Sequence, residues 1–216
     1  MDKYQLIIFD FDGTLVDTAP DIAICANRVL KQYGFEEKSL EEIKPTIRRG
    51  VNDLIRDLMF GPQGGELPAG CVEAFREDYL KNCLVKTEIY PGVVNVLKNE
   101  LANIKKVIVT NKPHHLALRM VESLRLSPFF LNVLGTGLDF KLKPNPEGSM
   151  HIMRELKVNA NEVLLIGDSD IDCQLAINAG VDFGWVDYGY GAKPEGSTRF
   201  VFSEASQWGI LNNGNV

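Results

Sequence analysis

The sequence predicts an α/β fold: a doubly wound parallel sheet that carries an inserted α-helical domain. Short runs of Val, Ile and Leu alternate along the 216 residues with segments of helical periodicity, as in parallel sheets with crossover helices. One interval between strands is much longer than a crossover needs, and its periodicity is helical. The expected strands are residues 6–10, 106–110, 131–135, 163–167 and 183–186, with a weaker sixth at 199–202.

Helices are expected between these strands. Ile171, Leu175 and Ala179 share one helix face, and Gly180 directly after them is typical of a C-terminal cap. Pro146 stands where another helix would begin, a position that proline favours. The alternation of strand and helix therefore continues to the last predicted strands.

The long interval lies between the first two strands. Roughly 100 residues separate Asp12 from Thr110, whereas a βαβ unit takes about 30. Apolar residues recur at helical spacing in three stretches of this interval, at 22–33, 51–58 and 72–79. We therefore expect a core domain made of residues 1–15 and 88–216, and an inserted helical domain made of residues 16–87.

Two aspartates, Asp10 and Asp12, come at the end of the first predicted strand. Because side chains alternate along a strand, both carboxylates can point to the same side. Gly13 then allows the backbone to turn sharply away. Like charges this close together destabilise a fold unless a cation or a shared proton offsets them. We therefore expect a cation or a proton to be bound at this end of the strand.

Polar residues also follow three later strands. Thr110 and Asn111 follow the second strand and could bind a phosphoryl oxygen, and Lys143 follows the third in a loop stiffened by prolines. Asp168 comes at the tip of the fourth strand, and Asp172 falls in the first turn of the next helix. Taken singly, each has a simpler explanation: Thr110 could close a strand, Lys143 could be a solvated loop residue, and one acidic residue near Asp168 could cap the helix. Several acidic residues together, however, are typical of a Mg²⁺ site.

Taken together, these motifs resemble the haloacid dehalogenase superfamily over nearly the whole sequence. The motifs occur in that family's order and rough spacing: Asp10-Phe11-Asp12-Gly13-Thr14, Thr110, Lys143, and Asp168 through Asp172. The resemblance implies a Rossmann-like core with strand order 5-4-1-2-3 and makes the helical insert a cap domain. It is closest to the phosphoglycolate phosphatase-like branch, through Thr110-Asn111-Lys112-Pro113 and Lys143-Pro144-Asn145-Pro146.

The resemblance implies a phosphatase that works through an aspartyl-phosphate. Asp10 would be the nucleophile that attacks phosphorus. Asp12 would give a proton to the leaving oxygen and later accept one from the hydrolytic water. Thr110 and the backbone amide of Asn111 would hold phosphoryl oxygens, and Lys143 would pair with the nucleophile and the transferring group.

The same resemblance implies a Mg²⁺ cofactor. Asp10, Asp168 and the backbone carbonyl of Asp12 would bind the ion, and Asp172 would support its water shell or orient Lys143. Four carboxylates and a phosphate dianion carry more charge than Mg²⁺ and one lysine neutralise. Protonation of Asp12 reduces this excess, which agrees with its implied role as an acid.

The expected substrate is a small phosphomonoester of the phosphoglycolate type. Arg48, Arg49 and Gly50 precede an amphipathic stretch of the insert, where caps of this family carry residues that read the substrate. Paired arginines could bind a second anionic group, such as the carboxylate of glycolate. A solvated basic corner is the alternative interpretation.

Other functions share parts of this pattern. A β-phosphoglucomutase-like sugar-phosphate mutase has the same core, but such mutases often carry valine where this chain has Thr14, which mildly favours hydrolysis. A pyrophosphatase or nucleotidase of the superfamily is a further alternative. A phospho-accepting receiver-like signalling domain also places an aspartate, a threonine and a lysine around Mg²⁺. Its acceptor ends the third strand, whereas the third strand here ends in Gly135-Thr136-Gly137 without an acid. We therefore expect an enzyme.

Composition narrows the partners and the compartment. A formal net charge of -6 disfavours an extended nucleic-acid footprint, and no Lys/Arg cluster or long apolar run indicates a membrane partner. The four cysteines contain no Cys-x-x-Cys pair and are expected to be reduced and packed. We expect a cytoplasmic protein that acts, as a monomer or homodimer, on a small phosphorylated metabolite.

Overall fold

The computed structural model describes residues 3–212 of the chain. They form two compact units: one ends at Val16 and resumes at Ile89, and the other is the helical unit Asp17–Glu88. Each division lies one residue after the corresponding predicted boundary. Within the described residues, no helix has the length and apolar character needed to cross a lipid bilayer.

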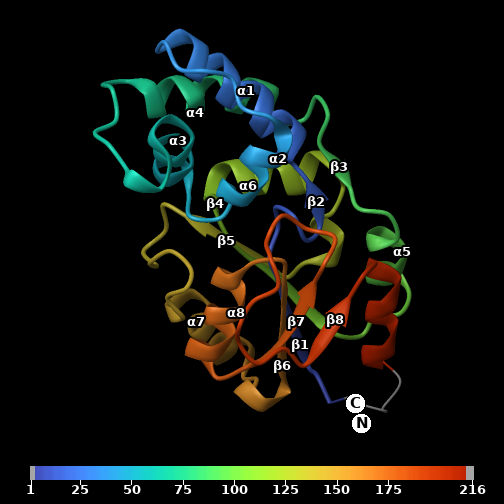
Figure 1. Cartoon of the computed structure of the whole chain (residues 1–216). Helices are drawn as coiled ribbons and strands as arrows, with labels where there is room; N and C mark the ends of the chain where they lie inside the picture. The colour runs from blue at the N-terminus through green and yellow to red at the C-terminus, as the bar shows by residue number, and fades with distance from the viewer. Residues whose placement is uncertain (1–2, 213–216) are drawn as a thin grey trace. The chain divides into compact units, whose positions relative to one another are not determined.

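The first unit is built on a six-stranded sheet (Figure 1). Its strands, in spatial order, are β5 (Asn132–Thr136), β4 (Lys105–Pro113), β1 (Leu6–Phe9), β6 (Val163–Gly167), β7 (Asp182–Val186) and β8 (Phe200–Phe202). Neighbouring strands pair in parallel throughout. The five main predicted strands, counted in chain order, are β1, β4, β5, β6 and β7, so the predicted order 5-4-1-2-3 corresponds to β7-β6-β1-β4-β5 and is confirmed. The weaker sixth strand is β8, at the edge beyond β7.

Helices cover both faces of this sheet, which explains why its central strands read as continuous apolar runs. All four residues of β1 and all five of β6 are buried. On one face, Ile8 belongs to an apolar cluster with side chains of α7 (Glu147–Leu156) and α8 (Asp170–Ala179). On the other face, the ring centroid of Phe9 lies 5.1 Å from that of Trp208 in the 3-10 helix η5 (Ala205–Asn212).

Two further helices and two 3-10 turns complete this unit. They are α5 (Val93–Lys98), α6 (His114–Ser123) and the 3-10 turns η3 (Ser127–Phe129) and η4 (Ala160–Glu162). As predicted, α8 ends at Gly180, whose φ of 69° is the left-handed conformation of a C-terminal cap.

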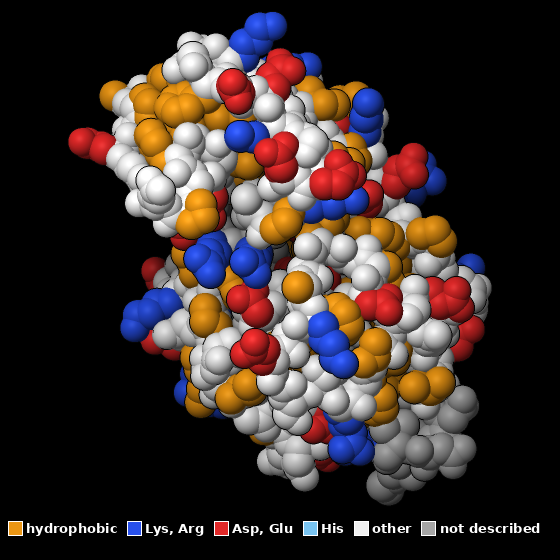
Figure 2. Space-filling view, in the orientation of Figure 1, with side chains coloured by type: hydrophobic (Ala, Val, Ile, Leu, Met, Phe, Trp, Pro, Cys, Tyr) orange, Lys and Arg blue, Asp and Glu red, His pale blue; other side chains and the backbone are white. Residues whose placement is uncertain are grey.

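On the face of the protein drawn in Figure 2, Lys and Arg side chains are interspersed with Asp and Glu, and no extended basic surface is visible there.

The helical unit contains the three predicted helices and one more. Its elements are α1 (Ala19–Gln32), α2 (Leu40–Ile43), η1 (Lys44–Thr46), α3 (Val51–Phe60), η2 (Gly61–Gln63) and α4 (Cys71–Asn82). Periodicity does not predict α2, since four residues are too few to show a helical period, although Ser39 and Glu42 form a recognisable capping box. The paired short strands β2 (Val16–Asp17) and β3 (Glu88–Ile89), where the chain passes between the units, were also not predicted.

A buried carboxylate ties the two ends of the helical unit together. Asp21, in the first turn of α1, is 1% exposed. It accepts hydrogen bonds of 2.9 to 3.0 Å from the backbone amides of Val85, Lys86 and Thr87 and from the Thr87 hydroxyl. Asp21 therefore fixes the segment that leads into β3 against the start of α1.

Replacing Asp21 should destabilise the protein. Asp21→Ala leaves three backbone amides without their acceptor, so we expect the free energy of unfolding to fall by about 2 to 4 kcal/mol. Asp53→Ala, which removes a partly exposed pair with Arg56 in the same unit, should change it by less than about 0.5 kcal/mol. Urea unfolding measures both, and equal effects of the two substitutions would contradict the prediction.

Candidate active site

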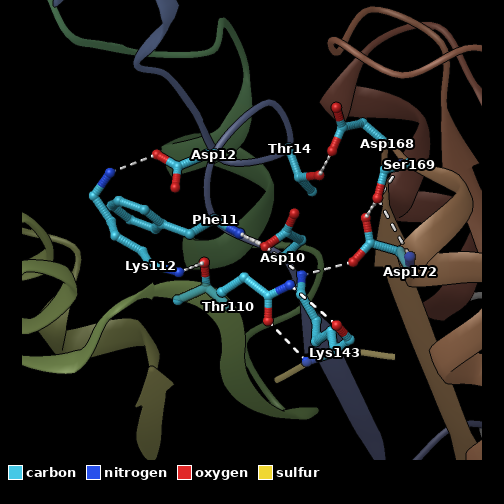
Figure 3. Close-up of polar contacts among 11 residues, drawn as sticks. Asp10, Phe11, Asp12, Thr14, Thr110, Lys112, Lys143, Asp168, Ser169 and Asp172 are labelled. Carbon is cyan, nitrogen blue, oxygen red and sulfur yellow. Dashed lines mark hydrogen bonds and ion pairs between the residues drawn. The ribbon is translucent and has the colours of Figure 1, made fainter. Parts of the chain in front are cut away.

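Strand β1 delivers Asp10 to the carboxyl edge of the sheet, where open α/β sheets place their ligand sites. The backbone amide of Asp10 still donates to the carbonyl of Ile166 in β6, at 2.9 Å. Its buried carboxylate accepts two hydrogen bonds on Oδ1, from the amide of Phe11 and from Nζ of Lys143, both at 2.7 Å (Figure 3). Two donors on one oxygen fix the orientation of this carboxylate.

Asp10 forms a buried acidic cluster with Asp168 and Asp172. One oxygen from each of the three carboxylates lies within 4.8 Å of the others. The Nζ atom of Lys143 lies 2.7 Å from Oδ1 of Asp10 and 2.7 Å from Oδ1 of Asp172 (Figure 3). The Lys143 ammonium group therefore offsets only part of the charge of three neighbouring carboxylates.

The pKa values of this cluster reflect the imbalance. Burial raises the pKa of Asp10 well above its ordinary value, the charge of Asp172 raises it further, and Lys143 opposes both. Burial, followed by the charge of Asp172, raises the pKa of Asp168 to about 7. Burial lowers the pKa of Lys143, but the carboxylates of Asp10 and Asp172 outweigh it and raise that pKa above its usual range. The site thus holds an excess of negative charge.

A hard divalent cation fits this donor set. Mg²⁺ binds carboxylate oxygens, and its charge would relieve the repulsion among Asp10, Asp168 and Asp172. Asp12, the fourth predicted ligand, was expected to bind through its backbone carbonyl; its carboxylate lies outside this cluster and pairs with Lys112 at 2.9 Å. The contact expected through the backbone carbonyl of Asp12 stays a prediction.

Asp172 also forms a capping box with Ser169, the N-cap of helix α8. Its Oδ2 accepts hydrogen bonds from the backbone amide and the hydroxyl of Ser169, at 3.1 and 2.5 Å, and the Ser169 Oγ accepts from the Asp172 amide at 3.3 Å. This capping box holds the side chain in place while Oδ1 contacts Lys143. The contact with Lys143 and the place of Asp172 in the acidic cluster are compatible with both predicted roles, which stay predictions.

The segment from Thr110 to Lys112 departs from regular strand pairing. The expectation that the strand ends at Thr110 is wrong, because β4 runs to Pro113, but its register with β5 shifts between Val109 and Pro113. The Thr110 hydroxyl oxygen accepts from the Lys112 amide at 3.2 Å. Between Val109 and Pro113, a side-chain hydrogen bond therefore takes the place of part of the regular backbone pairing of β4 with β5.

Asn111 holds the backbone of Lys143 through its side chain. Its Oδ1 accepts from the Lys143 amide at 2.8 Å, and its Nδ2 donates to the Lys143 carbonyl at 3.2 Å. The two bonds imitate the pairing of a strand and connect β4 to the loop that carries the lysine. The role predicted for Asn111, through its backbone amide, stays a prediction.

Lys112 was not among the predicted site residues. It is buried, and its Nζ lies 2.9 Å from Oδ1 of Asp12 and 6.0 Å from the ring centroid of Phe11 (Figure 3). The sequence placed Lys112 in the motif Thr110-Asn111-Lys112-Pro113 but gave it no role, since a lysine shortly after a strand is equally compatible with a solvated side chain. Asp10 and Asp12 therefore pair with different ammonium groups, and Lys112 adds a positive charge that the count with Lys143 alone omits.

Arg48, Arg49 and Gly50 belong to the helical unit. They follow η1, and Gly50 is the N-cap of α3 with a φ of 94°. Arg48 is half-buried and Arg49 is exposed. The predicted amphipathic helix after them is confirmed, since α3 buries Leu54 and Ile55. The expected contact of these residues with substrate stays a prediction.

Comparison with known proteins gives a consistent result. Residues 7–186 match the family model described as haloacid dehalogenase-like hydrolase. The phosphoglycolate phosphatase of Nitrosospira multiformis is 34% identical over 194 residues, which cover 86% of this chain and 84% of the relative. Phosphoglycolate phosphatase 1 of Pseudomonas aeruginosa is 30% identical over 86% of this chain and 70% of its own. The crystal structure of a predicted phosphoglycolate phosphatase from Haemophilus somnus 129PT superposes with a TM-score of 0.86 at 25% identity, and the match covers 96% of this chain and 97% of that one.

The acidic cluster should reduce the stability of the metal-free protein at high pH. Because the pKa of Asp168 rises from 3.8 to about 7 on folding, the fold favours the protonated form. The contribution of this group to stability is complete below pH 3.8 and is lost as the pH rises through about 7. In chelator at pH 8, Asp168→Asn should therefore be more stable than the wild type by about 0.5 to 2 kcal/mol.

Urea unfolding at pH 4 and pH 8 measures this difference, which should shrink toward zero at the lower pH. Asp139→Asn, at an exposed position of the same unit, is the matched control and should change little at either pH. The same gain in the control, or no gain in Asp168→Asn at pH 8, would contradict the prediction.

Proposed function

This chain belongs to the haloacid dehalogenase-like hydrolases and is a phosphatase, and we propose that it uses Mg²⁺ and an aspartyl-phosphate to hydrolyse a small phosphomonoester of the phosphoglycolate type. The observation that carries the proposal is the buried Lys143, 2.7 Å from both Asp10 and Asp172 in the acidic cluster. A carboxylate can attack a phosphate only when the charge of the phosphate is masked. This cluster supplies one cation and the oxygen ligands for a second.

Asp10 performs the first step of the proposed reaction. Its carboxylate attacks phosphorus, and the bond between phosphorus and the leaving oxygen breaks while Asp12 donates a proton to that oxygen. The Phe11 amide and Lys143 hold the attacking carboxylate in one orientation. When bound, Mg²⁺ supplies charge that neutralises the phosphoryl oxygens.

Asp12 performs the second step. It takes a proton from a water molecule that attacks phosphorus, and the bond from phosphorus to Asp10 breaks, which releases phosphate. Lys112, whose Nζ lies 2.9 Å from Oδ1 of Asp12, orients this carboxylate. Thr110 and the backbone amide of Asn111 hold the phosphoryl oxygens in both steps.

We further propose that Arg48 and Arg49 bind a carboxylate of the substrate. Guanidinium groups bind carboxylates in a bidentate manner, which makes arginine well suited to this recognition. Both curated relatives described above are named phosphoglycolate phosphatase, after a substrate that carries a carboxylate beside its phosphate. Arg48 and Arg49 are consecutive residues that directly precede Gly50, the N-cap of α3.

Removal of the metal or of the nucleophile should abolish turnover. Chelation should stop phosphate release from phosphoglycolate, and added Mg²⁺ should restore it. Asp10→Asn should lower kcat by at least about 10⁴-fold, because an amide is a poor nucleophile. A phosphate-release assay measures both effects, with Asp139→Asn as an active control. Substantial turnover by Asp10→Asn, or interconversion of glucose phosphates by the wild type in place of phosphate release, would refute the proposal.

The two arginines should affect substrates selectively. Arg48→Ala and Arg49→Ala should each raise KM for phosphoglycolate by about 10-fold, since a lost contact of about 1.4 kcal/mol has that effect. KM for 4-nitrophenyl phosphate, which lacks a carboxylate, should change by less than about 2-fold. Arg28→Ala, which removes an exposed pair with Asp78 in the same unit, is the control. Equal changes for both substrates would exclude a role in carboxylate recognition.

A further inference from the structure

We propose that the turn after β7, residues 188–191, is a positioning element for Asp168, and we call it the Asp168 strap. This inference rests on the proposed Mg²⁺-dependent function and adds to it the part of the chain that orients one metal ligand. The strap lies beyond residues 7–186, which match the family model. None of the motifs found in the sequence includes it.

The strap contacts Asp168 through backbone amides. The amide of Tyr190 donates to Oδ2 of Asp168 at 2.7 Å, and the amide of Gly191 donates to the same oxygen at 3.3 Å. Among residues 3–212, the contact to the other oxygen, Oδ1, is a long one of 3.4 Å from the hydroxyl of Thr14 (Figure 3). The strap therefore occupies one carboxylate oxygen and leaves the other for a cation.

The close approach of the strap requires glycine at two positions. A Cβ atom on Gly189 would lie 2.2 Å from Cβ of Asp168, and a Cβ atom on Gly191 would lie 2.3 Å from the backbone oxygen of Asp168. Both distances are far below van der Waals contact, so any other residue would displace the strap. The amides reach the carboxylate because these two residues lack side chains.

The strap and β7, the strand before it, contact two parts of the site. The Tyr188 hydroxyl donates to the backbone carbonyl of Thr14, in the loop after Asp10, at 2.9 Å. The Trp185 indole, in β7, donates to the backbone carbonyl of Asp168 at 3.0 Å. The strap thus joins the loop that carries the nucleophile to the residue that would share the cation with it.

Fixing Asp168 in this way lowers the cost of binding a cation. A carboxylate that accepts two amide hydrogen bonds on one oxygen cannot rotate freely, so little side-chain freedom is lost when the other oxygen binds metal. Displacement of the strap should therefore weaken Mg²⁺ binding. Saturating Mg²⁺ should restore much of the turnover, because the hydrogen bonds of the strap described above go to Asp168 and to the backbone carbonyl of Thr14.

The test measures Mg²⁺ binding to the full chain by isothermal titration calorimetry, with no substrate present. Gly189→Ala should raise the Kd for Mg²⁺ by about 10- to 100-fold, the usual effect of losing a group that supports a metal ligand. Gly148→Ala is the matched control, since its Cβ would meet Leu134 only at 3.4 Å. High Mg²⁺ should restore most of the kcat of Gly189→Ala, with KM for phosphoglycolate unchanged.

A second variant keeps the test decisive if Gly189→Ala does not fold. Tyr188→Phe removes only the anchoring hydroxyl and should also raise the Kd, whereas Tyr33→Phe, which removes a hydroxyl bound to the carbonyl of Ala69, should not. A wild-type Kd in folded Gly189→Ala, or in Tyr188→Phe where the glycine variant does not fold, would overturn the inference. A wild type that binds no Mg²⁺ would instead overturn the proposed metal dependence, and the inference with it.

Discussion

The site depends on mutual repulsion among buried carboxylates that the fold holds together. Asp10, Asp168 and Asp172 bring oxygens within 4.8 Å of one another, and burial prevents water from screening their charges. Lys143 relieves part of the repulsion, and the raised pKa values of Asp10 and Asp168 show what remains. This arrangement is unfavourable by itself, and the charge of a divalent cation would relieve it.

The topology of the sheet makes this arrangement possible. Strands β4, β1 and β6 are neighbours, so residues at their carboxyl ends meet although they are far apart in the chain. Side chains then connect the pieces: Asn111 after the regular part of β4 holds the backbone of Lys143, and Asp172 at the start of α8 holds its ammonium group. These contacts connect β4 and α8, two separate parts of the chain, to Lys143. The positions of Lys143 and the carboxylates therefore follow from the strand order together with a few hydrogen bonds between segments.

Much of the fold was predictable because the buried strands are apolar on both faces. The strand order was implied by the resemblance to the haloacid dehalogenase superfamily, and the grouping of Asp10, Asp168 and Asp172 was expected from acidic residues at strand ends together with that resemblance. Elements of two to four residues, such as α2, β2 and β3, are too short to leave a periodic signal. Lys112 and the Asp168 strap could not be found in the same way, because their roles depend on burial and on backbone amides. Contacts of that kind are set by tertiary structure and not by residue type.

The most direct test of the account is to trap the phosphorylated residue. Rapid acid quenching of the enzyme with phosphoglycolate and Mg²⁺, followed by borohydride reduction, converts an acyl phosphate on aspartate to homoserine, which peptide mass spectrometry locates. We expect homoserine at position 10 in the wild type and none when Mg²⁺ is chelated. Homoserine at another aspartate, or turnover without any reducible acyl phosphate, would contradict the central claim that the carboxylate cluster serves to let Asp10 accept the phosphoryl group.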